Sequence, residues 1–288
     1  MILIRGLSRV CVWALFTVGL TGSRTSALEL HPTATGPTDL ALTGLMTGLA
    51  PEEKRFIRWV DLAALPTSKL ELNGEFLPGP QEVTVLFLQD LWRALPRTAA
   101  ADTLLAVCKD GYSSVYTEEF IARYRPFLIL AINGAGPDRW PPPGLEFNPG
   151  PYVISVSAGV VPAVASLLDA GHKKPWGVDS LRVVRHDEAF TGFFGLPLSV
   201  SARAGREIWI NSCASCHPGP PETFGGTKSD RPFDVVAAHA RQNPDYFKKY
   251  VRAPKSFVSS AKMEPHPHYT DEQLAALIAF LSAVSPHP

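Results

Sequence analysis

The pattern of apolar and polar positions divides the chain into a strand-rich part and a helical part. Between residues 51 and 190, apolar runs of about six residues recur between turns rich in Pro, Gly and Asp, which is typical of β-strands. The run at 82–88 is also enriched in β-branched residues, which favour strands. The predicted strands are 70–72, 82–88, 103–108, 127–132, 152–156 and 178–184.

Short helices are predicted around these strands. Residues 51–60 carry acidic side chains in their first turn, and residues 88–95 continue directly from a strand. Thr117 can cap a further helix over 118–124. We therefore expect a mixed α+β domain, mostly β, over residues 51–190.

After residue 201 the apolar positions follow helical periodicity. Helices are predicted over 202–210, 244–252 and 270–284. Thr270 and Gln273 have the spacing of a capping box at the start of the last helix. Its apolar face is formed by Leu274, Leu277, Ile278 and Leu281. We expect an all-α domain over residues 201–288.

Three further segments lie outside these two domains. Residues 1–27 have a basic start, an apolar run of about a dozen residues and small residues at the end, the layout of a cleaved secretory signal peptide. Because the apolar run is too short to span a bilayer, we expect no stable membrane span after cleavage. The signal peptide predicts that the protein is periplasmic. Pro, Thr and Gly predict a flexible tether over 28–50. Residues 191–200 are expected to link the domains, and the phenylalanines there predict that the link packs.

Composition narrows the classes of partner. Lys and Arg together number 27, as do Asp and Glu, so the chain has no net charge that would favour nucleic acid or an anionic membrane. Of the four cysteines, Cys11 lies in the predicted signal peptide. Cys108 stands alone in a predicted strand, where we expect a small buried apolar side chain. The basic run 172–174 is expected to be a solvated turn.

The strongest chemical signal is the run Asn-Ser-Cys-Ala-Ser-Cys-His at residues 211–217. Two cysteines separated by two residues and followed by histidine form the attachment motif of a c-type haem. The thiols of Cys213 and Cys216 would each bond one vinyl group, and His217 would be an axial iron ligand. Zinc also uses such cysteine pairs, but the sequence holds no second pair to complete a zinc site. One covalent haem c is therefore predicted.

The residues around this motif resemble a class I cytochrome c with a single haem. Gly205 precedes Trp209 by four residues in the helix before the motif, and Phe280 lies near the end of the last helix. In that family the two helices cross, and the glycine allows a close approach. The resemblance implies an all-α cytochrome c fold over 201–288.

The same resemblance implies a second axial ligand between the motif and the last helix. Met263 is the only methionine of that interval, and Pro265 follows it with one residue between, where the family has proline directly after methionine. A thioether is a neutral, soft ligand that favours ferrous iron. His239, His266 and His268 remain alternatives. The last two alternate with prolines and are expected to lie in an exposed surface loop, with adventitious metal binding as the alternative.

Aromatic and basic residues are expected to wall the haem pocket. The candidates are Trp209, before the motif, and Tyr250 and Arg252, in the predicted helix over 244–252. Lys255 is a further candidate for a haem propionate, and the sequence does not choose among these residues.

The order of elements over about residues 60–185 resembles the molybdopterin-binding domain of the sulfite-oxidase type. A strand and a short helix precede Asp110-Gly111-Tyr112, and a Gly/Pro loop leads into the strand at 152–156. In that family a cysteine ahead of the corresponding Asp-Gly-Tyr binds molybdenum. Residues 70–88 contain no cysteine, and Cys108 is not at the ligand position. The resemblance therefore implies the fold without the metal site.

These observations predict a secreted electron-transfer protein that carries single electrons to or from a redox partner protein through a His217/Met263-ligated haem. The first domain is expected to be a docking or specificity module rather than an enzyme. Two alternatives stay open: a fused molybdopterin-type oxidoreductase whose first domain reduces the haem, and a haem-based ligand sensor.

Overall fold

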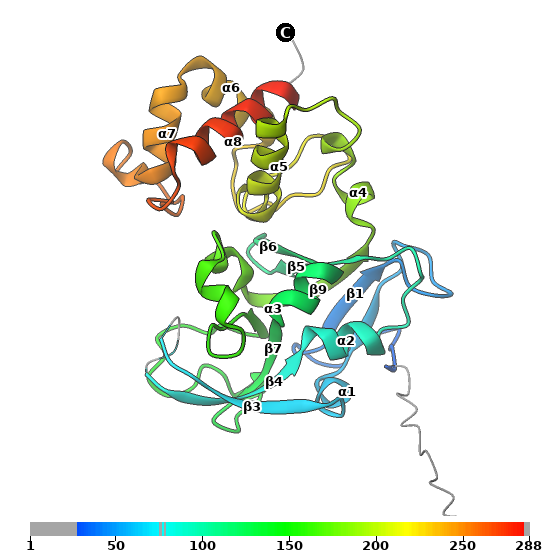
Figure 1. Ribbon diagram of the computed structural model, residues 1–288. Coiled ribbons are helices and arrows are strands. Elements are labelled where there is room, and N and C mark those ends of the chain that lie inside the picture. The colour runs from blue at the N-terminus through cyan, green and yellow to red at the C-terminus, as the bar shows by residue number, and fades with distance from the viewer. Residues whose placement is uncertain (1–27, 75–76, 78, 285–288) are drawn as a thin grey trace, which may run out of the picture.

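The computed structural model describes residues 28–74, 77 and 79–284, so the predicted signal peptide, 1–27, lies outside the described residues. A sheet domain carries a helical domain on one side (Figure 1). In the described residues, no helix combines the length and the apolar character needed to cross a membrane.

The sheet domain is built on one nine-stranded sheet. Its main path is β2 (Arg55–Ile57), β1 (Leu40–Gly44), β9 (Trp176–Val184), β8 (Tyr152–Ser155), β7 (Phe127–Ile132), β4 (Gln81–Phe87) and β3 (Thr67–Leu72). β5 (Thr103–Cys108) also pairs with β9 and forms a hairpin with β6 (Ser113–Thr117). All pairs are antiparallel except β1 with β9.

All six predicted strands lie in the sheet. The central strands follow from apolar runs that are buried on both faces. β7 is buried along its whole length, and β5 exposes only one residue in part. Cys108, at the end of β5, is a buried free thiol, as predicted. Three short helices accompany the strands: α1 (Trp59–Ala63), α2 (Leu88–Ala94) and α3 (Glu118–Tyr124). Thr117 caps α3 through a bond from the Phe120 amide, as predicted.

The predicted tether over 28–50 is wrong as a description of this segment, because the segment contributes β1 to the sheet. Leu40 and Leu42 of β1 are buried and alternate with half-buried neighbours. The strand is short and set among Pro, Thr and Gly, so its period-two pattern is hard to distinguish from a loop.

The single helix predicted over 51–60 is also wrong, because β2 and the start of α1 occupy the segment. β6 was not predicted. Its serines, Ser113 and Ser114, are buried, and buried serines give no apolar pattern.

The helical domain follows a short α4 (His186–Ala189) and consists of α5 (Val200–Asn211), α6 (Phe233–Gln242), α7 (Pro244–Arg252) and α8 (Asp271–Val284). α5 and α8 cross in direct contact. A Cβ on Gly205 would collide with the Ala276 backbone carbonyl, so glycine is needed at the crossing. The capping box of α8 is formed, with Thr270 N to Gln273 Oε1 at 2.8 Å and Gln273 N to Thr270 Oγ1 at 3.1 Å.

The link over 191–200 packs against the helical domain, as its phenylalanines predicted. Phe193 is fully buried, with ring centroids 5.2 Å from both Phe233 and Phe280.

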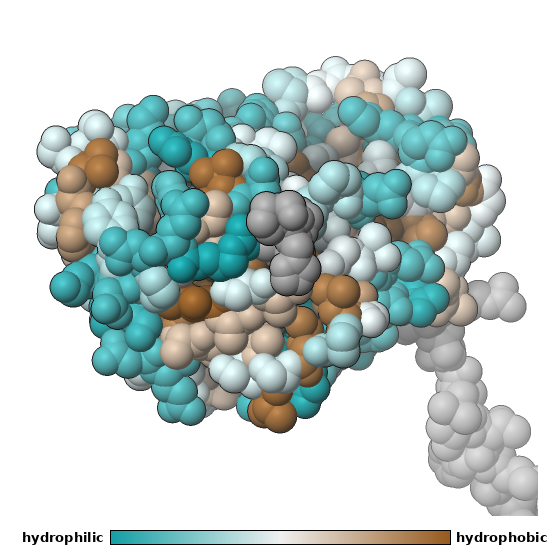
Figure 2. All heavy atoms as spheres, turned by 90° about the horizontal axis from the view of Figure 1, so that it is seen from above, coloured by the Kyte–Doolittle hydropathy of each residue, from teal (hydrophilic) through white to brown (hydrophobic). Residues whose placement is uncertain are grey.

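On the molecular surface seen from above, hydrophilic residues surround small hydrophobic patches (Figure 2).

The two domains contact each other along what we call the seam: residues 110–112, Asp169 and η3 (Ala170–Lys173) of the sheet domain against residues 211, 226–228 and 266–269 of the helical domain. Thr227 donates its amide to the Gly111 carbonyl at 2.8 Å. Lys228 pairs with Asp110 at 2.7 Å. The seam places part of the sheet domain against the loop that follows the haem motif.

Lys173 contradicts the prediction of a solvated turn over 172–174. The side chain is only 2 % exposed. Its ammonium donates to the Val115 carbonyl at 2.7 Å and to Asn211 Oδ1, on α5, at 3.0 Å. A lysine in the seam therefore ties β6 to the end of the helix that precedes the haem motif.

Candidate functional site

The cysteine motif forms one helical turn directly after α5. Backbone bonds run from the Cys216 amide and the His217 amide to the Cys213 carbonyl, at 3.1 and 3.0 Å. Both cysteines are half-buried free thiols. Burial raises the pKa of Cys213 and raises that of Cys216 to about 11, so both thiols are neutral near pH 7. The turn therefore presents two reduced thiols and an imidazole in consecutive positions.

The imidazole of His217 is oriented by the backbone. Its Nδ1 lies 2.7 Å from the Arg231 carbonyl oxygen. Because a carbonyl only accepts, Nδ1 carries the hydrogen, and Nε2 keeps the lone pair that a metal needs. Burial lowers the pKa of His217, which favours the neutral ring, while the Arg231 carbonyl opposes that shift. This hydrogen bond leaves Nε2 able to accept a metal.

Trp209 lies beside this imidazole, with ring centroids 6.0 Å apart, and contacts Phe233 edge to face. The ring is fully buried, and its Nε1 has no hydrogen-bond partner among the residues that the structure describes. An unpaired buried N–H costs about 1–3 kcal/mol. An acceptor supplied by a bound group, such as a carboxylate, would remove that cost.

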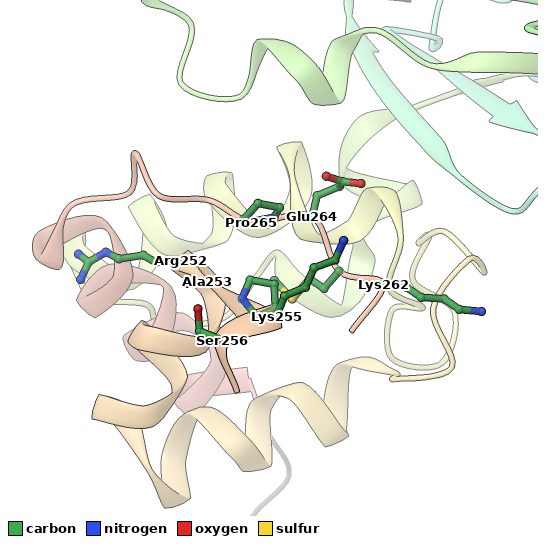
Figure 3. A pocket seen from close by; sticks show the side chains of 9 residues that line it. Arg252, Ala253, Lys255, Ser256, Lys262, Glu264 and Pro265 are labelled. Atoms are coloured by element: carbon green, nitrogen blue, oxygen red, sulfur yellow. The ribbon is translucent and has the colours of Figure 1, made fainter. Parts of the chain in front are cut away.

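Met263 lines a cavity of about 420 Å³ between the end of α7 and the loop over 262–265 (Figure 3). The methionine is half-buried and packs against the helical core. The remaining lining residues are Arg252, Ala253, Pro254, Lys255, Ser256, Lys262, Glu264 and Pro265. The soft thioether of Met263 therefore lines a cavity that also carries basic side chains.

The structure separates the two predicted pocket residues of α7. Arg252 lines the cavity, but its guanidinium points away from it (Figure 3) and bonds the Tyr269 carbonyl at 2.9 Å and Asp271 at 2.7 Å. Tyr250 is not among the cavity residues; its ring lies 5.9 Å from Tyr246 and 6.4 Å from Phe257. Arg252 therefore holds the start of α8, and Tyr250 belongs to an aromatic cluster.

Two features of the site carried no signal in the sequence. The Arg231 carbonyl orients His217, and a backbone oxygen is not visible in a residue pattern. Gly226 donates its amide to the Ala214 carbonyl at 2.7 Å, which ties the following loop to the cysteine turn. Lys262 also lines the cavity, and its position beside Met263 was the only indication available.

The residues present fit a haem c. Two neutral thiols share one turn, the adjacent imidazole keeps Nε2 available, a buried indole N–H lacks an acceptor, and a thioether lines a hollow. His266 and His268, the alternative axial ligands, instead lie in the seam against Asp169. His239 lies on α6.

Comparison with known proteins assigns the helical part. Residues 200–281 match the family described as cytochrome c oxidase, cbb3-type, subunit III. The chain is also similar to cytochrome c oxidase subunit 2 of Alkalihalophilus pseudofirmus, with 28 % identity over 97 residues. That similarity covers 31 % of this chain and 27 % of the relative, so the chain spans about a quarter of the relative's length.

The chain is therefore a mixed β-sheet region followed by a helical cytochrome c domain. A cytochrome c domain implies a covalent haem c, redox partners and haem-based electron transfer, and the cysteine pair fits the attachment motif.

Proposed function

We propose that this protein is a secreted cytochrome that carries single electrons between partner proteins through one haem c. Cys213 and Cys216 would hold the haem through thioether bonds, and His217 and Met263 would be the axial ligands. The observation that carries the proposal is the hydrogen bond from His217 Nδ1 to the Arg231 carbonyl, because it leaves Nε2 free directly after the cysteine turn.

Under this proposal, Met263 and Trp209 each have a specific role toward the bound haem. The bound haem would supply reversible one-electron chemistry at iron. Met263 offers a neutral sulfur, which favours the ferrous state, and two protein ligands leave no open position for a substrate. The unpaired Nε1–H of Trp209 would donate to a haem carboxylate.

We also propose that the sheet domain is a docking or specificity module and not a catalyst. Residues 110–112 pack against residues 226–228, beside the cysteine turn, so the sheet domain limits the directions from which a partner can approach. Burial raises the pKa of Cys108 to about 12, so the thiol is protonated and apolar rather than a thiolate ready for a metal. This favours the docking role over the molybdopterin-type alternative.

The cellular location and the boundaries at 27, 190 and 201 stay as expected from the sequence, and only the start of the sheet domain moves, from 51 to about 28. Residues 1–27 would be removed as a signal peptide, and the mature protein would be periplasmic, where c-type haem is attached. The sheet domain would begin near residue 28, because β1 belongs to it, and would end near 190. The cytochrome domain would follow from 201 to 288.

The test replaces the sulfur ligand. In the haem-loaded protein, Met263→Ala should lower the reduction potential and let the ferrous iron bind carbon monoxide, because one axial position opens. Met46→Ala is the matched control, since Met46 is buried in the sheet-domain core. Redox titration and optical spectra measure both variants.

An unchanged potential and spectrum in Met263→Ala would refute Met263 as a ligand. Tight carbon monoxide binding by the unaltered ferrous protein would instead favour the ligand-sensor alternative.

A further inference from the structure

A cluster of two histidines and one aspartate lies in the seam. Asp169 comes from the sheet domain, directly before η3, and His266 and His268 come from the loop before α8. One ligand atom of each residue lies within 4.8 Å of the other two. The sequence predicted both histidines to be exposed, but His266 is only 7 % exposed. The prediction holds for His268, which is exposed, and fails for His266, which His172 of the sheet domain covers.

Asp169 is a buried carboxylate that faces both imidazoles. Its Oδ1 lies 3.4 Å from His268 Nε2 and 3.8 Å from His266 Nδ1. The hydroxyl of Tyr269 lies 2.8 Å from each carboxylate oxygen. Since that hydroxyl has a single hydrogen, it orients the carboxylate without using up its acceptor capacity. A hydrogen-bonded carboxylate beside two imidazoles is the usual surrounding of a bound metal.

The imidazole of His266 is fixed in plane by its neighbours. It stacks on His172, with centroids 5.2 Å apart, and on Tyr269, at 4.8 Å. His172 is itself held by the Tyr112 hydroxyl, 2.8 Å from its Nδ1. The ligands are therefore positioned before any ion arrives.

The donor set selects a class of ion. Two imidazole nitrogens and one carboxylate oxygen suit Zn²⁺, and tetrahedral bonds of about 2.0–2.2 Å put neighbouring ligand atoms about 3.4 Å apart. The two distances to Asp169 Oδ1, 3.4 and 3.8 Å, lie near that spacing. The side chain of His268 is 46 % exposed, which leaves a route from solvent and space for a water ligand. We propose that Asp169, His266 and His268 form a second metal site, for a zinc-class divalent ion, that joins the two domains.

Such an ion would connect the sheet domain to the segment that carries Met263, because His266 follows Met263 by three residues. The site would therefore act as a clamp across the seam. A second group, Glu29, His31 and Asp61, has similar residue types. It is a weaker candidate because His31 Nε2 bonds Asp61 at 2.8 Å, a tighter contact than the 3.4 Å between His268 Nε2 and Asp169 Oδ1, and because the Glu29 side chain is 75 % exposed.

The experiment titrates Zn²⁺ into the haem-loaded, chelator-treated full chain by calorimetry. We expect one equivalent to bind with a dissociation constant of about 1 μM or tighter. Asp169→Asn and His268→Gln should each weaken binding at least about tenfold, because each removes one ligand. His31→Gln, in the second group, should leave the constant unchanged. Zn²⁺ should raise the thermal midpoint of the unaltered protein and of His31→Gln only.

His268→Gln keeps the test informative if Asp169→Asn fails to fold, because the His268 side chain is half exposed. Absence of one-to-one binding below about 100 μM would overturn the proposal. Binding that survives in His268→Gln, or that disappears in His31→Gln, would overturn it equally.

Discussion

The cysteine turn at 213–217 and the seam lie side by side, yet different parts of the sequence determine their geometry. The turn is local: α5 leads into it, and the Cys213 carbonyl bonds the amides of Cys216 and His217. The seam is assembled from segments far apart in the chain, such as Asp169 with Tyr269, 100 residues later. Chemistry that depends on spacing is therefore visible in the sequence, and chemistry that depends on tertiary contact is not.

The largest expected effect comes from separating the two helices that support the turn. Gly205→Val should lower the free energy of unfolding by about 3 kcal/mol, because the new side chain meets the Ala276 backbone at the α5–α8 crossing. Denaturant unfolding measures the loss. Gly171→Ala is the control: a Cβ there has no atom within 4 Å, so its effect should stay under about 0.5 kcal/mol. Equal losses in the two variants would contradict the close crossing.

A smaller effect concerns the buried lysine of the seam. Burial lowers the pKa of Lys173 to about 7, opposed by Asp169, whereas the unfolded chain titrates near its ordinary 10.5. Between these two pKa values, Lys173 binds a proton more fully in the unfolded state than in the folded state. The free energy of unfolding should therefore rise with pH, by up to about 1 kcal/mol per pH unit. Lys173→Met removes the charge and should flatten that slope between pH 7 and 9. Denaturant unfolding across this range measures it, and identical slopes would show that Lys173 is not the group responsible.

The smallest effect concerns the ion pair at the edge of the seam. Asp110 and Lys228 are 2.7 Å apart, but each side chain is 46 % exposed. Asp110→Asn should therefore cost only about 0.5 kcal/mol, and added salt should reduce the difference. Asp230→Asn, at a 92 % exposed side chain, is the control and should have no measurable effect. A salt-independent loss of several kcal/mol would mean that Asp110 has a buried role.

The contrast between turn and seam also explains which parts of the fold could be predicted. Strands such as β7 and helices such as α8 follow from continuous apolar runs and helical periodicity. β1 could not be predicted in this way, because its five residues lie among Pro, Thr and Gly and form a strand by pairing with β9 and β2. β6 was not predicted, because two of its buried residues are serines, and Ser114 donates to the His172 carbonyl.

The same holds for the site residues. The cysteine pair, His217 and Gly205 lie within one helix and the turn that follows it, so the sequence alone placed them close together. His266 was misjudged because its partner, Asp169, comes from another segment. Arg252 lines the cavity beside Met263, but its pairing with Asp271 was not visible in the sequence.

Covalent haem on the cysteine turn is the central claim, and mass spectrometry of the denatured protein tests it most directly. The unaltered chain should retain the mass of one haem, located on the peptide over 211–217. The Cys213→Ala/Cys216→Ala variant should lose the haem on denaturation, whereas Cys108→Ala should keep it. A denatured chain without attached haem, or haem retained by the double variant, would contradict the account.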